Sequence, residues 1–223
     1  MTEKKSFLKR KELLSEVNRL LYQKYGRLHC KLNHHNAFEL LVATILSAQC
    51  TDVRVNQVTS NLFKRFPDAA SFAAADPAAV EEMIITAGLF RNKSKSIIAA
   101  SRKIVEDYQG MVPAEMDALT CLPGVGRKTA NVVLGDAFGV PGFPVDTHVK
   151  RVLNRQGCTD SEEPEQIEAE VNSAIAPEYW VNLSHMLIMH GREICHARNP
   201  GCEHCLLNSL CRYYKKIKRN LAI

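Results

Sequence analysis

The chain has 223 residues, a hydrophobic content of 46% and a formal net charge of +5. This length allows one large domain or two small ones, each with its own core. The sequence lacks an apolar run of about eighteen residues, and its N-terminal stretch MTEKKSFLKRKELL has no apolar signal core. These features exclude a membrane-spanning helix and a secretion signal, so we expect a soluble, intracellular protein.

The positive charge gathers at the two ends of the chain. Residues 191–223 carry seven basic side chains against two acidic ones, and a second basic cluster lies within residues 4–11. Basic ends are typical of proteins that bind a polyanion, although a solvated lysine-rich tail is the commoner meaning of such a run.

Almost every segment has the apolar spacing of a helix. FELLVATILSAQC, residues 38–50, is apolar nearly all round, which predicts a helix buried in a core. Thr51 and Asp52 can cap a following helix, whose buried residues we expect to be Val55, Val58, Leu62 and Phe66. Residues typical of helix first turns and helix ends recur along the chain: Pro77, Pro164 and Pro177 for starts, Gly88, Gly110, Gly139 and Gly157 for ends. Because no convincing strand pattern appears, the predicted fold class is all-α.

The stretch LPGVGRKTANVVL, residues 122–134, places two glycines shortly before a lysine. A phosphate-binding P-loop would need a glycine where Arg127 stands, and a dinucleotide fingerprint would need one where Thr129 stands. Helical spacing on both sides instead predicts a helix, a tight turn and a second helix over about residues 115–138. The start of such a second helix offers outward N–H groups to a phosphate. An ordinary turn between two helices is an equally good interpretation of the hairpin alone.

Four of the eight cysteines lie in one short segment with the spacing C-x6-C-x2-C-x5-C. The segment comprises Cys195, Cys202, Cys205 and Cys211, whereas the other cysteines are scattered as core residues usually are. Four close thiols without a secretion signal favour a metal centre over disulfides. Structural zinc sites usually come as two short-spaced pairs, so a [4Fe–4S] cluster fits better, although the spacing alone leaves zinc open.

Taken together, these motifs carry a specific likeness. LPGVGRKTANVVL, then VDTHVKR, then the four-cysteine segment resemble endonuclease III, a family of bacterial DNA glycosylases, and LLVATILSAQCTD and GLF add to the match. The resemblance covers nearly the whole chain from residue 38. It implies a two-lobed helix-hairpin-helix DNA glycosylase fold, with a six-helix domain over residues 30–140. Residues 1–29 and 141–223 would form the iron-sulfur cluster domain, with the [4Fe-4S] loop at 195–211.

The resemblance also implies an activity. A protein of this family would be a bifunctional DNA glycosylase and AP lyase of base excision repair, which removes oxidised pyrimidines from duplex DNA through a lysine Schiff base and cuts the strand by β-elimination. Its partner would be double-stranded DNA with damaged bases or abasic sites. It would act as a cytoplasmic monomer, associated with the nucleoid of a bacterium.

Two residues match the catalytic positions of the family. Lys128 would be the nucleophile, and Asp146 would stabilise positive charge on the sugar as the base departs. Schiff-base chemistry needs a neutral amine, and the positive end of a helix disfavours the ammonium form. On the residues alone, Lys128 is equally well a solvated surface lysine, and Asp146 before THVKRVLNR is foremost a helix N-cap.

Five residues match the DNA-binding positions. The resemblance assigns phosphate contact to the hairpin residues Gly124, Val125 and Gly126. It assigns Gln49 and Leu89 to the space that a flipped base leaves in the duplex. Leu89 is equally well a core residue, whereas Gln49 is unusual as a polar residue at the end of an apolar segment.

Three other functions share parts of the pattern. An adenine-mismatch glycosylase has the same hairpin, aspartate and cluster but typically lacks the lysine at position 128. A non-catalytic DNA-binding metalloprotein needs neither Lys128 nor Asp146. An iron-sulfur electron carrier has no use for the hairpin.

Overall fold

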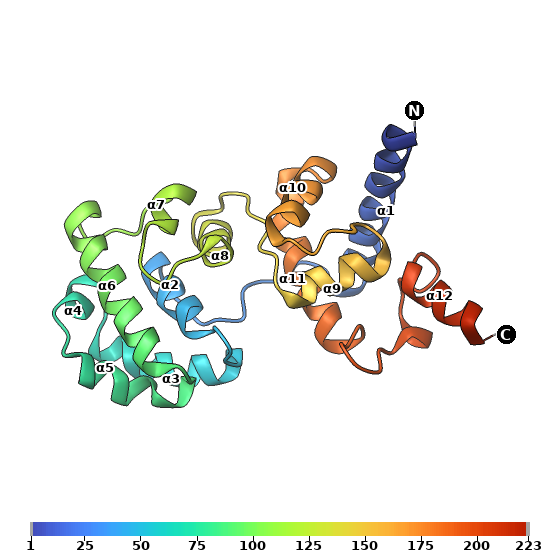
Figure 1. Cartoon of the computed structure of the whole chain (residues 1–223). Helices are drawn as coiled ribbons and strands as arrows, with labels where there is room; N and C mark the ends of the chain where they lie inside the picture. The colour runs from blue at the N-terminus through green and yellow to red at the C-terminus, as the bar shows by residue number, and fades with distance from the viewer. Residues whose placement is uncertain (1, 222–223) are drawn as a thin grey trace. The chain divides into compact units, whose positions relative to one another are not determined.

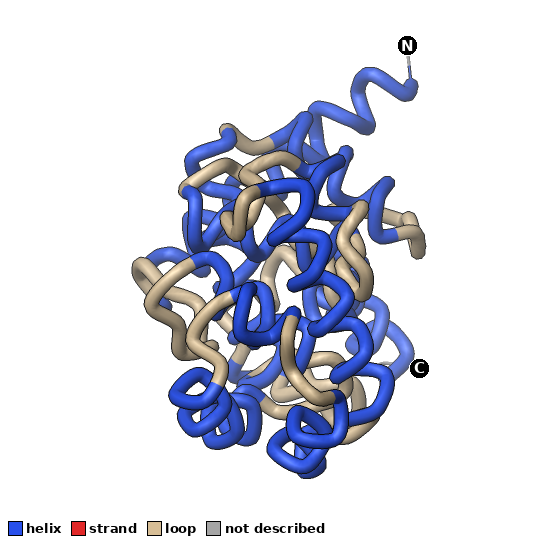
Figure 2. Tube along the Cα trace, turned by 90° about the vertical axis from the view of Figure 1, so that its left-hand side faces the viewer, coloured by secondary structure: helices blue, strands red, loops and turns tan. Residues whose placement is uncertain are grey.

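The computed structural model describes residues 2–221, with side chains from Lys9 to Asn220. This part of the chain consists of helices and loops and contains no strand, as Figure 2 shows. The prediction of an all-α fold is therefore confirmed. None of the helices within these residues combines the length and the apolar character that crossing a bilayer requires.

The chain forms two compact units, each with its own hydrophobic core (Figure 1). The central unit is Cys30–Val140. The terminal unit combines Met1–His29 with Pro141–Ile223, so it contains both ends of the chain.

Helix α6 organises the central unit, because it packs against α2, α4 and α5, while α8 packs against α2 and α7. The apolar faces of these helices meet in one core, in which Leu41, Leu62, Phe72 and Ile97 are almost completely buried. The elements of the unit are α2 (Ala37–Leu46), α3 (Asp52–Arg65), α4 (Ala69–Ala73), α5 (Pro77–Ile84), η1 (Ile85–Ala87), α6 (Phe90–Tyr108), α7 (Met116–Thr120) and α8 (Arg127–Phe138).

Local signals set several helix boundaries in the central unit. The Thr51 hydroxyl accepts a hydrogen bond from the Arg54 N–H at 3.3 Å and caps α3, whose expected inward residues are all buried. Pro77 is the first residue of α5, where its missing N–H costs nothing. Gly139 ends α8 with a φ of +66°, a conformation that favours glycine.

In the terminal unit, α11 packs against α1 and α9, α1 packs against α10, and α12 packs against α9. Pro164 begins α10 as expected, but Pro177 begins a short 3-10 turn instead of an α-helix, and the next α-helix starts only at Trp180. The elements are α1 (Thr2–Tyr25), α9 (Thr147–Gln156), α10 (Pro164–Ala174), η2 (Pro177–Tyr179), α11 (Trp180–Glu193), η3 (Cys202–His204) and α12 (Arg212–Leu221).

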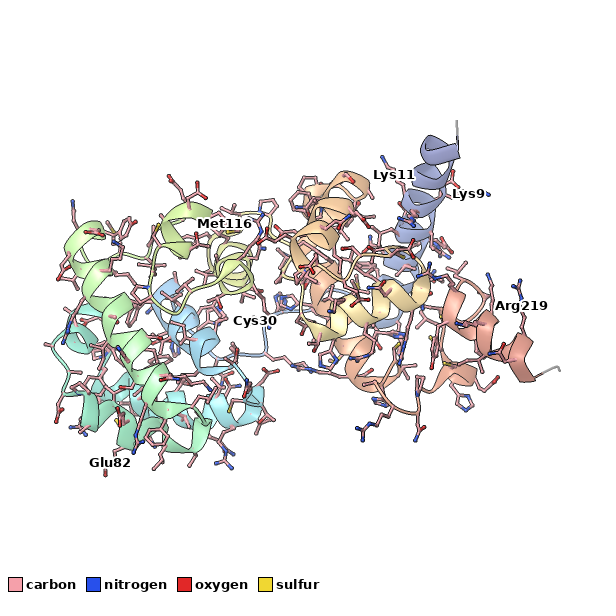
Figure 3. The ribbon with its side chains drawn as sticks, viewed as in Figure 1. Lys9, Lys11, Cys30, Glu82, Met116 and Arg219 are labelled. Carbon is pink, nitrogen blue, oxygen red and sulfur yellow. The ribbon has the colours of Figure 1, made fainter. Side chains whose placement is uncertain are left out.

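One carboxylate ties the first and last helices of the terminal unit together. Asp160 accepts hydrogen bonds from Arg10 of α1 and from Arg212 of α12. Both basic ends therefore belong to this unit, and Figure 3 shows Lys9 and Lys11 of α1 and Arg219 of α12 extending away from the ribbon. The side chains of residues 4–8, which complete the N-terminal basic cluster, lie outside the described part.

Candidate functional site

The hairpin between α7 and α8 depends on a glycine packed against a neighbouring helix. Gly124 has a φ of +78°, and a Cβ atom there would lie only 2.5 Å from the Cβ of Ser96 in α6. Val125 is buried, and its N–H donates to the Leu122 carbonyl at 3.1 Å. Gly124 and the Val125 side chain therefore shape the turn from the inside.

The beginning of α8 is open to a ligand. Gly126 is its N-cap in extended conformation and supplies no side-chain cap. Apart from its two chain neighbours, no described residue has an atom within 4 Å of where its Cβ would stand. The first intrahelical hydrogen bond runs from the Ala130 N–H to the Gly126 carbonyl at 3.0 Å. The N–H groups of the first helical turn have no acceptor within the helix, and together with the helix dipole they favour an anion at this end.

Lys128 lies in this first turn with an exposed side chain. Ala130, Val133 and Leu134 are buried on the core side of the same helix, as their spacing predicts. On a helical wheel Asn131 falls on the same side as Lys128, opposite these buried residues, but the structure buries it. It is only 3% exposed, and its Nδ2 atom has no hydrogen-bond partner among the described residues. The polar stripe around Lys128 is therefore narrower than the helical wheel suggests.

Gln49 and Leu89 occupy two exposed turns of the central unit. The helix expected over residues 38–50 ends at Leu46, because Ser47 to Gln49 form a turn in which Gln49 has a φ of +54°. Leu89 follows η1 with a φ of +49°, and its side chain is 53% exposed. The interpretation of Leu89 as a core residue is therefore wrong. Non-glycine residues seldom adopt this left-handed conformation, and they often mark functional sites where they do.

Lys93 binds the backbone beside both turns, a contact that the sequence does not predict. Its side chain is 5% exposed, and its Nζ atom donates to the carbonyls of Leu46 and Ala87 at 2.8 Å each. Burial lowers the pKa of this lysine. The sequence RNKSKSI does not predict that Lys93 is buried and Lys95 exposed, because the hydrogen-bond partners of Lys93 lie in other segments.

Asp146 caps α9 in the terminal unit. Its Oδ1 atom accepts hydrogen bonds from the His148 and Val149 N–H groups, both at 2.8 Å. These two bonds leave the second carboxylate oxygen available, and the side chain is half-buried. The N-cap role expected from the sequence is therefore present, and its two hydrogen bonds use one of the two carboxylate oxygens.

A single arginine connects the start of α9 with the cysteine segment. The Arg151 side chain donates from Nε to the Cys195 carbonyl at 2.9 Å and from Nη2 to the Gly191 carbonyl at 2.9 Å. The same Nη2 atom lies 3.0 Å from Nδ1 of His148. Burial lowers the pKa of His148. The Asp146 carboxylate acts in the opposite direction, and the charges of Arg151 and Arg192 lower the pKa further. Because an arginine can only donate, the hydrogen bond from Arg151 requires an unprotonated Nδ1 on His148, and the lowered pKa acts in the same direction.

The four clustered cysteines line one pocket of the terminal unit. Cys195 and Cys211 are buried, Cys202 and Cys205 are half-buried, and all four are free thiols. Within the described residues, no three His, Cys, Asp or Glu side chains converge closely enough to hold one metal ion. The four sulfurs surround a space instead of meeting at a point.

The surroundings of the sulfurs suit thiolate ligands. Burial raises the pKa of Cys211, while the Tyr214 and Tyr213 N–H groups at the start of α12 act in the opposite direction. Arg155 donates to the Cys195 sulfur at 3.4 Å and stacks over the Tyr213 ring at 4.6 Å. A metal cluster bound by four thiolates is negative, and N–H donors and an arginine beside its sulfurs offset that charge. The donor set and its pocket therefore fit a [4Fe–4S] cluster.

The chain also resembles proteins of known function. Residues 42–177 match the HhH-GPD superfamily of base excision DNA repair proteins. Endonuclease III of Synechocystis is 49% identical over 91% of this chain and 93% of its own, and endonuclease III of Bacillus subtilis is 46% identical over 84% and 86%. A solved structure of a trapped covalent intermediate of endonuclease III with DNA is 41% identical, with a TM-score of 0.89 over 94% of this chain and 99% of that one. On this similarity in sequence and fold, the chain belongs to the endonuclease III family within the HhH-GPD superfamily.

Proposed function

We propose that the protein is a bifunctional DNA glycosylase and AP lyase of base excision repair, which removes oxidised pyrimidines from duplex DNA. Family membership and relatives named endonuclease III support this function. The observation that carries it is the exposed Lys128 beside the open N-terminus of α8. A phosphate held by that helix end brings the sugar of the same strand within reach of the amine.

Lys128 is the nucleophile in this proposal. Its Nζ atom forms a bond to C1′ of the damaged nucleotide while the bond from C1′ to the base breaks, and the base departs with that electron pair. The nitrogen of this adduct then loses a proton as the C1′–O4′ bond breaks, and the ring oxygen takes up a proton, which gives the open-chain Schiff base. The Schiff base loses a proton from C2′, and the bond from C3′ to the 3′ phosphate breaks, which cuts the strand. Water releases the lysine from the remaining sugar fragment. The relative trapped as a covalent intermediate with DNA supports this chemistry.

Asp146 stabilises the sugar as the base leaves. Positive charge develops on the sugar ring in the transition state, and a fixed carboxylate lowers the energy of that charge. The two N–H groups bound to Oδ1 fix the carboxylate orientation. In this proposal the same carboxylate also accepts a proton from the attacking amine.

In this proposal one part of the protein contacts the DNA phosphates and another part contacts the stacked bases. The N–H groups after Gly126 hold a phosphate and carry no base information. Flipping a base costs a few kcal/mol, least for a damaged one. Gln49 and Leu89 fill the vacated space, which their exposure in two neighbouring turns permits.

The cysteine pocket would hold a [4Fe–4S] cluster, with Cys195, Cys202, Cys205 and Cys211 as its ligands. The cluster, when bound, supplies the iron-thiolate bonds that brace residues 195–211. Arg151 extends this brace to the start of α9, because it holds the Cys195 carbonyl and approaches the His148 ring. We place the protein in the cytoplasm at the nucleoid, acting as a monomer on double-stranded DNA.

Borohydride trapping on a lesion panel tests the proposal. Duplexes with one oxidised pyrimidine, one uracil, one adenine mispair or one abasic site are incubated with protein and borohydride, which reduces a Schiff base to a stable link. We expect trapping and strand cleavage with the oxidised pyrimidine and the abasic site, and neither with Lys128→Ala. Adenine release without trapping would indicate a mismatch glycosylase, and the absence of any base release would indicate a non-catalytic DNA-binding protein.

A further inference from the structure

The buried ammonium of Lys93 joins two backbone segments that are 41 positions apart, from Leu46 to Ala87. A charged group in a protein interior is costly unless hydrogen bonds replace its hydration. Lys93 meets that condition with the two carbonyls at 2.8 Å. One flexible side chain therefore fixes the distance between these two segments.

Each of the two carbonyls lies just before one of the exposed turns. Leu46 is the last residue of α2, and the turn with Gln49 follows at once. Ala87 is the last residue of η1, and Gly88 and Leu89 follow it. The carbonyl end of a helix carries partial negative charge, so an ammonium is favoured at Leu46.

Lys93 also holds Leu89 from its other side. The backbone N–H of Lys93 donates to the Leu89 carbonyl at 3.0 Å, in the first turn of α6. The side chain of Lys93 donates to the Ala87 carbonyl, two positions before Leu89. Leu89 is thus held in its left-handed conformation by bonds on both sides. Such a conformation persists only where the surroundings overdetermine it.

We propose that Lys93 is a positioning residue, which holds Gln49 and Leu89 as one preformed wedge for the gap left by a flipped base. This inference rests on the proposed role of Gln49 and Leu89. Without the ammonium, the two turns lose their common anchor, and the wedge must be ordered at the moment of base flipping. Ordering at that step slows base extrusion, while the phosphate contact at α8 stays intact.

The test compares Lys93→Met with Lys95→Met. Methionine keeps the length and apolar stem of lysine but donates no hydrogen bond, and the exposed Lys95 on the same helix controls for the lost charge. Base unstacking is followed by the fluorescence of a 2-aminopurine beside the lesion, and excision by single-turnover rates. We expect Lys93→Met to lower the fluorescence increase and to slow excision about tenfold or more. Lys95→Met should match the unchanged protein in both measurements.

A second substrate separates positioning from general damage to the fold. In a duplex with an abasic analogue opposite the lesion, the lesion is already unpaired and flips more easily. We expect the Lys93→Met defect to shrink on this substrate, with unchanged affinity for undamaged duplex, and Lys93→Gln to regain part of the rate through its amide donor. Equal losses on both substrates together with weaker binding to undamaged duplex would overturn the positioning role.

Gln49→Ala and Leu89→Ala complete the design. If these two variants lower the fluorescence signal and Lys93→Met does not, the inference on Lys93 is wrong and the wedge proposal stands. If none of the three variants changes the signal, the wedge proposal fails and the inference on Lys93 fails with it. If Lys93→Met does not fold, Lys93→Gln is compared with Lys95→Gln instead, and we expect a smaller defect because glutamine keeps one amide donor.

Discussion

Gly124 packs so closely against Ser96 that a Cβ atom on the glycine would lie 2.5 Å from the serine Cβ. Gly124→Ala should therefore strain the hairpin, both through this contact and through the φ of +78° that alanine rarely adopts. We expect a loss of about 2 kcal/mol in the free energy of unfolding, measured by denaturant titration. Adding Ser96→Gly to the Gly124→Ala variant should recover only part of the lost stability, because it removes the close contact but leaves the backbone strain.

Gly126→Val should weaken DNA binding while changing the stability of the protein little. The backbone there is extended and no atom lies near the new side chain, so we expect the stability to fall by less than about 1 kcal/mol, the scale of a changed N-cap. The valine would nevertheless cover the N–H groups at the start of α8. Affinity for damaged and undamaged duplex should fall alike, by about tenfold, the scale of one hydrogen bond to a charged group. A loss confined to damaged duplex in an anisotropy titration would contradict the phosphate-anchor role of the hairpin.

Asp146→Asn should separate base removal from strand cutting. Asparagine keeps the oxygen that caps α9, so we expect nearly unchanged thermal stability. The variant loses the negative charge and should excise a damaged base at least about a hundredfold more slowly. On a preformed abasic site, where no base has to leave, more activity should remain. Equal losses on the two substrates would mean that Asp146 serves chiefly in proton transfer from Lys128.

Cys202→Ala should lose the metal centre. Iron and acid-labile sulfide analysis of the unchanged protein should give about four of each per chain, together with visible absorption. The variant should lack both and should unfold its terminal unit more easily. Cys158→Ala should keep them, since Cys158 lies in the core outside the cysteine pocket. Stoichiometric zinc in anaerobically purified protein would identify a zinc site instead.

Asp160→Asn should loosen the ends of the terminal unit. The hydrogen bond from Arg212 lowers the pKa of Asp160, so the carboxylate stays ionised at neutral pH and holds Arg10 as well. Amide hydrogen exchange in α12 should become faster in the variant. Glu16→Gln breaks a pair with Arg19 within α1 and is the matched control. Equal exchange rates in both variants would show that the Asp160 bridge does not restrain α12.

Features that depend on neighbouring residues could be predicted from the sequence. The caps at Thr51 and Asp146 and the proline at the start of α5 each depend on contacts within three residues. The all-α class follows from helical spacing along the chain. These signals are local, so no knowledge of the tertiary structure is needed to read them.

Features set by distant contacts could not be predicted. Helix α2 ends at Leu46, where the carbonyl binds Lys93, a residue 47 positions away. Arg151 reaches the Cys195 carbonyl across 44 positions. Asn131 is buried although the helical wheel places it beside Lys128, because a wheel shows one helix and not the neighbours that cover it.

The terminal unit is discontinuous in sequence, and this has a consequence for how the chain folds during synthesis. The central unit is one continuous segment, so its core can form while the ribosome is still adding later residues. Helix α1 is made before the central unit, whereas its partners α10 and α11 are made only after it. The apolar face of α1, with Leu14, Val17 and Leu21, is therefore exposed for that interval. Pairing over such a sequence distance is slow, so we expect the apolar face of the nascent α1 to need protection from aggregation until α10 and α11 emerge.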